Sequence, residues 1–78
     1  MPATAEYRKK ASRIMRAEMT RRGIRYAELA RRLRELGADE TEQTLMSKIS
    51  RGTFQAALFL MCMKAMGVKN VPLDGEEG

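Results

Sequence analysis

The sequence has 78 residues, which is the size of one small domain. It contains no histidine and one cysteine, which excludes a disulfide framework, a His/Cys metal site within one chain and histidine-dependent catalysis. Charged residues make up 32% and hydrophobic residues 44% of the chain, a composition typical of folded proteins. We therefore expect a folded, non-enzymatic protein that uses no metal ion or other cofactor.

The positive charge is concentrated in the first half of the chain. The net charge is +5, but residues 1–34 hold eleven Lys and Arg against three Glu, a net of +8. Residues 35–78 hold four basic and seven acidic side chains, a net of −3. Such a basic surface suits phosphate groups, an acidic protein or an anionic membrane surface. The alternative is a solvated basic helix that only aids solubility.

Two amphipathic helices are predicted in this basic half. In residues 6–22, apolar side chains recur every three or four positions and the other faces carry Arg and Lys. In residues 25–36, apolar side chains form a similar stripe, and Glu28 can pair with arginines one turn later. Gly23 and Gly37 follow the two stretches, as is common at the C-terminal ends of helices.

A third helix is predicted to begin near Asp39 and to end before Gly52. Asp39 followed three residues later by Glu42 fits a capping box, in which two side chains bond the first backbone N–H groups of a helix. Leu45, Met46 and Ile49 form a narrow apolar stripe, so the opposite face should be exposed. That face carries hydrogen-bonding side chains, namely Glu40, Gln43, Thr44, Ser47, Lys48 and Arg51.

The fourth predicted helix, residues 55–66, is apolar on nearly every side and must therefore be buried on nearly every side. Because a small domain can seldom surround such a helix, we weigh two arrangements. Either the other three helices ring it as a central core helix, or part of it forms a subunit interface. For the second arrangement we expect a homodimer with interface residues Leu58, Phe59, Met61 and Met63.

After the fourth predicted helix, the end of the chain is expected to contain no further helix. Residues 68–73 are expected to form a short extended arm and residues 74–78 a flexible acidic tail, so that residues 1–73 are the single domain. The longest apolar run, residues 56–63, is too short to span a bilayer, and no signal peptide is indicated. A single unpaired cysteine fits a reducing compartment, so we expect a cytoplasmic protein without membrane contact.

Four short helices predict an all-α fold class. Residues 25–36 and 39–51 are expected to form a helix-turn-helix, whose second helix lies in the major groove of DNA. Its outer side chains suit that role, since Gln can bond adenine, Lys or Arg can bond guanine, and Thr can contact a base edge. Cations of the first helix would bind phosphates. A polar outer face is, however, also the default for any surface helix.

From Arg16 onward the sequence resembles the phage-repressor type of helix-turn-helix domain, the Cro and lambda-repressor class. Residues 25–33, Arg-Tyr-Ala-Glu-Leu-Ala-Arg-Arg-Leu, are similar to that family's second helix. Residues 45–52, which end in Arg-Gly, are similar to its recognition helix. The longer segment 14–74 resembles a group of short bacterial proteins catalogued only as a domain of unknown function. These resemblances imply a four- to five-helix lambda-repressor-like domain with a short C-terminal arm.

The resemblance also implies roles for individual residues. By position, the base-reading side chains are Gln43, Thr44, Ser47 and Lys48. The expected phosphate contacts are Tyr26 and Arg51 by position, and Arg13 and Arg16 by charge. The sequence departs from the family pattern by about six extra residues within residues 34–42, by Ser50 at a usually acidic position, and by Glu40 and Glu42 near the reading face.

We therefore expect a small transcriptional regulator that binds duplex DNA sequence-specifically, as a homodimer, with the helix at 40–51 in the major groove. The alternative is an adaptor with the same fold that binds an acidic protein through the apolar helix 55–66, where methionines would suit an adaptable interface. Few aromatic residues are present, which disfavours RNA and membrane binding. No ligand pocket and no small-molecule substrate are indicated.

Overall fold

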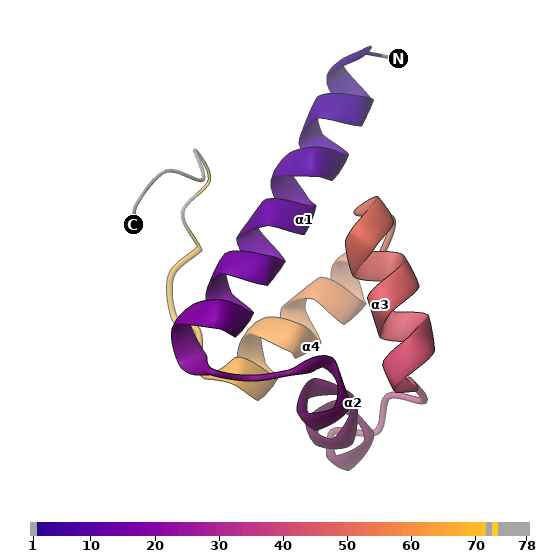
Figure 1. Cartoon of the computed structure of the whole chain (residues 1–78), viewed down its shortest axis with the longest axis vertical. Helices are drawn as coiled ribbons and strands as arrows, with labels where there is room; N and C mark the ends of the chain where they lie inside the picture. Colours follow the sequence, from indigo (N-terminus) through magenta and orange to yellow (C-terminus); the bar gives the residue numbers. More distant parts are fainter. Residues whose placement is uncertain (1, 72, 74–78) are drawn as a thin grey trace.

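The computed structural model describes residues 2–71 and residue 73. This part of the chain contains four helices and no strand: α1 (Pro2–Arg22), α2 (Tyr26–Glu35), α3 (Glu42–Arg51) and α4 (Ala56–Met66). Figure 1 shows α1 along the longest axis, with its N-terminal turns extending beyond the other helices and α2 below its C-terminal end. The predicted all-α fold class is confirmed for the described residues.

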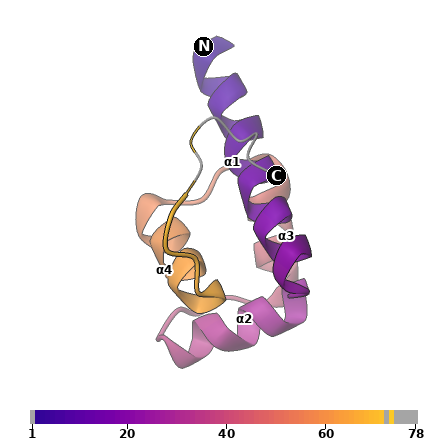
Figure 2. The same cartoon turned by 90° about the vertical axis from the view of Figure 1, so that its left-hand side faces the viewer.

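The helices pack in a closed ring, in which α1 and α2 each contact both α3 and α4. Figure 2 shows α2 crossing beneath α3 and α4, which lie on different sides of the molecule. The backbone of α4 therefore approaches only α1 and α2 closely. The arrangement with α4 ringed by the other three helices is wrong, because a four-helix ring leaves one side of each helix exposed.

The hydrophobic core takes side chains from all four helices. In the apolar stripes predicted for the second and third helices, Leu29, Leu33, Leu45 and Ile49 are almost fully inaccessible. The prediction is wrong for Leu36, which lies beyond the last residue of α2, and for Met46, at the edge of the α3 stripe, because these side chains are 40% and 42% exposed. Each such side chain stabilises the fold by about 1.5–3 kcal/mol relative to its exposed state. Four of the seven methionines lie in the same cluster, where they fill core space. The cluster comprises Met15, Met19, Ile24, Leu29, Ala30, Leu33, Leu45, Ile49, Cys62, Met63 and Met66.

Helix starts differ from the sequence-based expectations at two places. Helix α1 begins at Pro2 rather than at residue 6, and proline is well suited to a first helical position because it needs no backbone hydrogen bond there. Helix α3 begins at Glu42, with Thr41 as the N-cap. The predicted capping box of Asp39 and Glu42 is therefore wrong by two residues. The helix is therefore shorter than the expected range 40–51. Residues 36–41 form the linker between α2 and α3, and this linker contains most of the residues by which the sequence exceeds the phage-repressor pattern.

Thr41 and Thr44 form the observed capping box. Thr41 Oγ1 accepts a hydrogen bond from the Thr44 backbone N–H at 3.1 Å, and Thr44 Oγ1 accepts one from the Thr41 N–H at 2.9 Å. Because α3 begins at Glu42, Glu40 lies in the linker before the helix, and there it is buried. The physical reason for the misprediction is that Asp and Thr both cap helices well, so the tertiary environment of the linker decides between them.

Gly52 fixes the approach of α3 to α1. It ends α3 with φ +67°, and a Cβ built there would lie 3.0 Å from the Cα of Arg8 and 2.7 Å from its carbonyl carbon. Any side chain would therefore meet the backbone of α1. After α4, residues 68–71 have no regular structure, and Val68 and Val71 pack against the core. The predicted acidic tail, residues 74–78, lies outside the described residues.

Candidate nucleic-acid interface

The outer face of α3 presents polar side chains to solvent. Leu45 and Ile49 anchor the helix in the core, while the side opposite them is exposed. The exposed polar residues of α3 are Glu42, Gln43, Thr44, Ser47, Ser50 and Arg51. Gln43 and Ser47 make no side-chain hydrogen bond to any other described residue. Their donors and acceptors are therefore available to an external partner.

Basic side chains of α1 border this face. Arg16 Nη2 donates a hydrogen bond to Ser50 Oγ at 3.4 Å, which connects the two helices near the C-terminal end of α3. Arg13 lies one turn earlier on α1, is exposed and has no ion pair within residues 2–71 and 73. Because α1 and α3 pack side by side, a molecule resting on the outer face of α3 would also meet Arg16.

A hollow of about 700 Å³ lies where the α1–α2 turn meets the start of α3. Its polar lining includes Arg16, Arg25, Tyr26 and Glu42. Tyr26 is half-buried against the core, as the stripe of α2 predicted, and lines the hollow beside the two arginines. The arrangement combines two cations with a phenol, which suits a phosphate, but Glu42 contributes an opposing negative charge.

Glu40 holds two of the four expected base-reading residues. The residue is 8% exposed, and its carboxylate accepts hydrogen bonds from Thr44 Oγ1 and from Lys48 Nζ, each at 2.7 Å. Burial alone would raise the pKa of the Glu40 carboxyl, but the hydrogen bonds from Lys48 and Thr44 and the charge of Lys48 outweigh it and lower this pKa. The side chains of Lys48 and Thr44 are therefore already bonded to Glu40 within the protein. The sequence pattern did not predict these contacts.

Several arginines form ion pairs with a carboxylate of their own helix. Arg31 and Arg32 both bind Glu28, at 2.6 and 2.8 Å, as the spacing on the predicted second helix indicated. The hydrogen bonds from Arg31 and Arg32 hold the pKa of Glu28 at about 2. The buried carboxylate of Glu18 binds two further arginines at the end of α1. Among the described residues, the cations without a carboxylate partner include Arg8, Lys9, Arg13, Arg16, Arg25 and Arg51.

Comparison with known proteins places the chain in one family. Residues 7–71 match the family model described as Domain of unknown function (DUF6471). The chain belongs to this family. No curated protein and no solved structure matches it significantly. The DUF6471 match agrees with the expected group of proteins of unknown function, whereas no phage-repressor family model matches, so that resemblance stays a prediction.

The expected subunit interface of this DUF6471 chain needs one correction. Leu58, Phe59 and Met61 are partly buried and pack against the core. Met63 is only 5% exposed, so its expected place at an interface is wrong for the folded protomer. The physical reason is that Met63 belongs to the core cluster, whereas Leu60, one turn earlier, is exposed. An unbroken apolar run contains no periodic signal that separates these two positions.

The described DUF6471 residues contain no cluster of three or more His, Cys, Asp or Glu side chains arranged to hold a metal ion. Burial, reinforced by the negative charge of Glu40, raises the pKa of the Cys62 thiol to about 12. Cys62 is therefore an unreactive core residue at neutral pH. Over the same part of the chain, none of the helices combines the length and the apolar character that crossing a membrane requires.

Proposed function

We propose that this protein binds duplex DNA with the outer face of α3 in the major groove. The observation that supports this proposal is the contact between Arg16 on α1 and Ser50 on α3, because it sets a basic helix beside a polar one. DNA-binding proteins use that combination, in which flanking cations and amides position the protein on phosphates and side chains of one helix read base edges.

The residues divide into two groups by their availability. Gln43 and Ser47 are exposed without partners among the described residues and are the proposed base-reading side chains. Arg16, which contacts Ser50, and Arg51 at the end of α3 are exposed cations. Together with Arg13, an exposed cation one turn before Arg16 on α1, they are the proposed phosphate contacts. Thr44 and Lys48 now have a different proposed role, since their bonds to Glu40 fix the N-terminal half of α3.

The pairing of Lys48 with Glu40 also bears on whether the acidic linker between α2 and α3 would repel DNA. A carboxylate near the reading face would repel phosphate, but Glu40 is buried and neutralised by Lys48. Tyr26 and Arg25 lie at the start of α2, where a second phosphate contact is proposed. A homodimer stays part of the proposal, with two α3 helices about 34 Å apart on an inverted repeat.

The test is fluorescence anisotropy of the full chain with a pool of labelled random duplexes, from low to physiological salt. We expect log affinity to fall linearly with log salt, because bound cations release counterions from the phosphates. Arg16→Gln should reduce the slope by about one contact on every sequence. Lys64→Gln is the matched control, since Lys64 is an exposed cation on α4 without an ion pair in the described residues.

Base reading is tested by selecting the tightest duplexes and repeating the selection with Gln43→Ala. We expect a loss of about 1–3 kcal/mol at one base position and relaxed preference there. Unchanged preference would show that Gln43 does not read bases. A folded sample that binds no duplex at low salt would remove the DNA proposal, and the adaptor function of the apolar helix would then be the proposal to test.

A further inference from the structure

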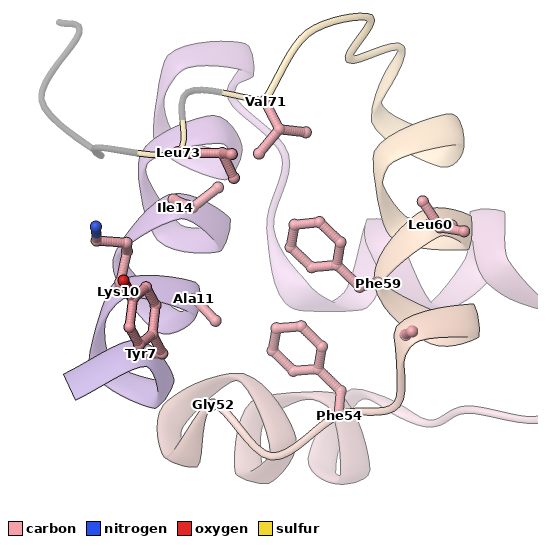
Figure 3. A pocket seen from close by; sticks show the side chains of 11 residues that line it. Tyr7, Lys10, Ala11, Ile14, Gly52, Phe54, Phe59, Leu60, Val71 and Leu73 are labelled. Atoms are coloured by element: carbon pink, nitrogen blue, oxygen red, sulfur yellow. The ribbon is translucent and has the colours of Figure 1, made fainter. Parts of the chain in front are cut away.

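An apolar groove of about 810 Å³ lies between α1 and α4. Figure 3 shows its two walls, with Tyr7, Ala11 and Ile14 from α1 on one side and Phe59 and Leu60 from α4 on the other. Phe54 and Phe59 stack in parallel at its base, with ring centroids 5.6 Å apart. Val71 and Leu73, from the segment after α4, line the remaining edge (Figure 3).

Most of the large hydrophobic side chains that are exposed in the described residues line the groove. Five large hydrophobic side chains are exposed in this part of the chain, and three of them line the groove. These three are Tyr7, Leu60 and Leu73, which are 64%, 66% and 77% exposed. Such side chains would gain free energy if a partner buried them. A concave apolar surface of this kind is typical of a binding site.

One edge of the groove is basic. Tyr7 and Lys10 line the groove and also line a second hollow of about 370 Å³, together with Glu6, Lys9 and Arg13. Lys10 Nζ lies 5.2 Å from the centroid of the Tyr7 ring. No carboxylate lines the groove itself, and the adjoining hollow has three cations for one carboxylate. An apolar surface therefore continues directly into a positively charged one.

We propose that this groove binds an amphiphilic anion, a molecule with a hydrocarbon body and one terminal carboxylate. The body lies on the stacked rings of Phe54 and Phe59, and the carboxylate lies at the edge formed by Tyr7 and Lys10, where the charge is complementary. The volume falls within the range of about 300–1,000 Å³ that is usual for small-molecule sites. The inference does not depend on DNA binding, since the groove residues differ from those proposed to contact DNA, except Arg13 in the adjoining hollow. Phe59 also belongs to the expected homodimer interface, so the experiment must distinguish the ligand from a second copy of the chain.

The experiment uses the ¹⁵N-labelled full chain and dodecanoate below its critical micelle concentration. We expect saturable binding at one site, followed by amide shifts that are largest for groove residues such as Ala11 and Phe59. Decanoate should bind more weakly by about fourfold for each CH₂ that it lacks. Dodecanol should bind about two- to fivefold more weakly than dodecanoate, because it lacks the charge attracted by Lys10, and dodecyltrimethylammonium should bind most weakly.

Two matched pairs of variants locate the site. Leu60→Asp should weaken dodecanoate binding at least about tenfold, because it places a charge in the apolar wall. Leu36→Asp, at another exposed apolar residue that does not line the groove, should leave binding unchanged. Lys10→Gln should remove the preference for dodecanoate over dodecanol, and Lys64→Gln should keep it. Leu60 and Leu36 are both exposed, so these variants are expected to fold.

Three results would overturn the proposal. Equal binding of the carboxylate and the quaternary ammonium would remove the charge argument. Unchanged binding in Leu60→Asp would show that the amphiphile binds elsewhere. Sedimentation as a dimer, with no uptake of dodecanoate and with the groove amides protected, would show that a second copy of the chain covers the groove. The first two results leave the DNA-binding proposal unaffected, and the third would support its homodimer, so the two proposals fail separately.

Discussion

The two sides of α1 differ in what they leave exposed. Toward α3, the apolar side chains Met15, Leu45 and Ile49 are buried together, and the surface above them is polar and basic. Toward α4, the apolar side chains Tyr7 and Leu60 stay in solvent. The difference arises because the core covers most of the narrow apolar stripe of α3 and leaves only Met46 exposed at its edge, whereas α4 is apolar all round and a ring of four helices covers only part of it. The two surfaces therefore suit different partners.

Gly52 is the residue at which both surfaces meet, and its substitution should have the largest effect on stability. Gly52→Ala would place a Cβ against the backbone of Arg8 and would hold alanine at φ +67°. We expect a loss of about 3 kcal/mol or more in the free energy of unfolding, since left-handed strain and a backbone clash add. Urea denaturation followed by circular dichroism at 222 nm measures it.

Gly23→Ala is the matched control for this prediction. Gly23 has the same φ of +67°, but a Cβ there meets nothing within 4 Å. The expected loss is about 1–2 kcal/mol, which comes from backbone strain alone. Equal losses in the two variants would show that the close approach of α3 to α1 contributes nothing beyond the backbone conformation of Gly52.

The second prediction concerns the polar side, where Lys48 neutralises the buried Glu40. Lys48→Ala should lower the free energy of unfolding by about 1–2 kcal/mol, because it leaves a buried carboxylate with one hydrogen bond fewer. Gln43→Ala, at an exposed residue of the same helix, should change it by less than about 0.5 kcal/mol. The double variant Glu40→Gln/Lys48→Ala should recover part of the loss, and no recovery would contradict the proposed ion pair.

The sequence predicted those features that depend on periodicity within one helix. The burial of Leu29 and Leu33, and of Leu45 and Ile49, follows from their spacing, and so does the exposure of the opposite face of α3. The pairing of Glu28 with arginines one turn later is equally local. These features need no knowledge of how the helices pack.

Features that depend on tertiary packing were not predictable. Asp39 and Thr41 are both good caps, and α3 uses Thr41, which leaves Glu40 buried in the linker before the helix. The apolar groove joins Tyr7 to Leu73, two residues from opposite ends of the described chain. In α4 every position near Leu60 is apolar, so only the packing of the helices determines which side chain stays in solvent.

The third prediction concerns acid stability and the ion pairs of α2. The pKa of Glu28 in the folded protein is about 2, below the value of 4.5 for an unperturbed side chain, because it accepts hydrogen bonds from Arg31 and Arg32. Its contribution to stability is therefore fully present above pH 4.5 and is lost as the pH falls toward 2. Urea unfolding between these pH values should show a steeper decline for the wild type than for Glu28→Gln.

Salt provides the control for this acid effect. Glu28 is exposed, so its ion pairs are screened at high ionic strength, where the Debye length falls to about 3 Å at 1 M. The difference between the wild type and Glu28→Gln should shrink at about 1 M NaCl. A difference that is unchanged by salt would mean that Glu28 stabilises α2 through contacts other than its pairing with Arg31 and Arg32.

The smallest effect is expected on the apolar side, at the wall of the groove. Leu60→Gln should change the free energy of unfolding by less than about 0.5 kcal/mol, because Leu60 is 66% exposed and glutamine is a similarly good helix former. Met63→Gln, one turn later in α4, should cost about 2–4 kcal/mol, because it puts a polar amide into the core. Urea denaturation of both variants measures the contrast. A large loss for Leu60→Gln would show that folding or dimerisation already uses this side chain, whereas a negligible loss would leave it free to bind a ligand in the groove.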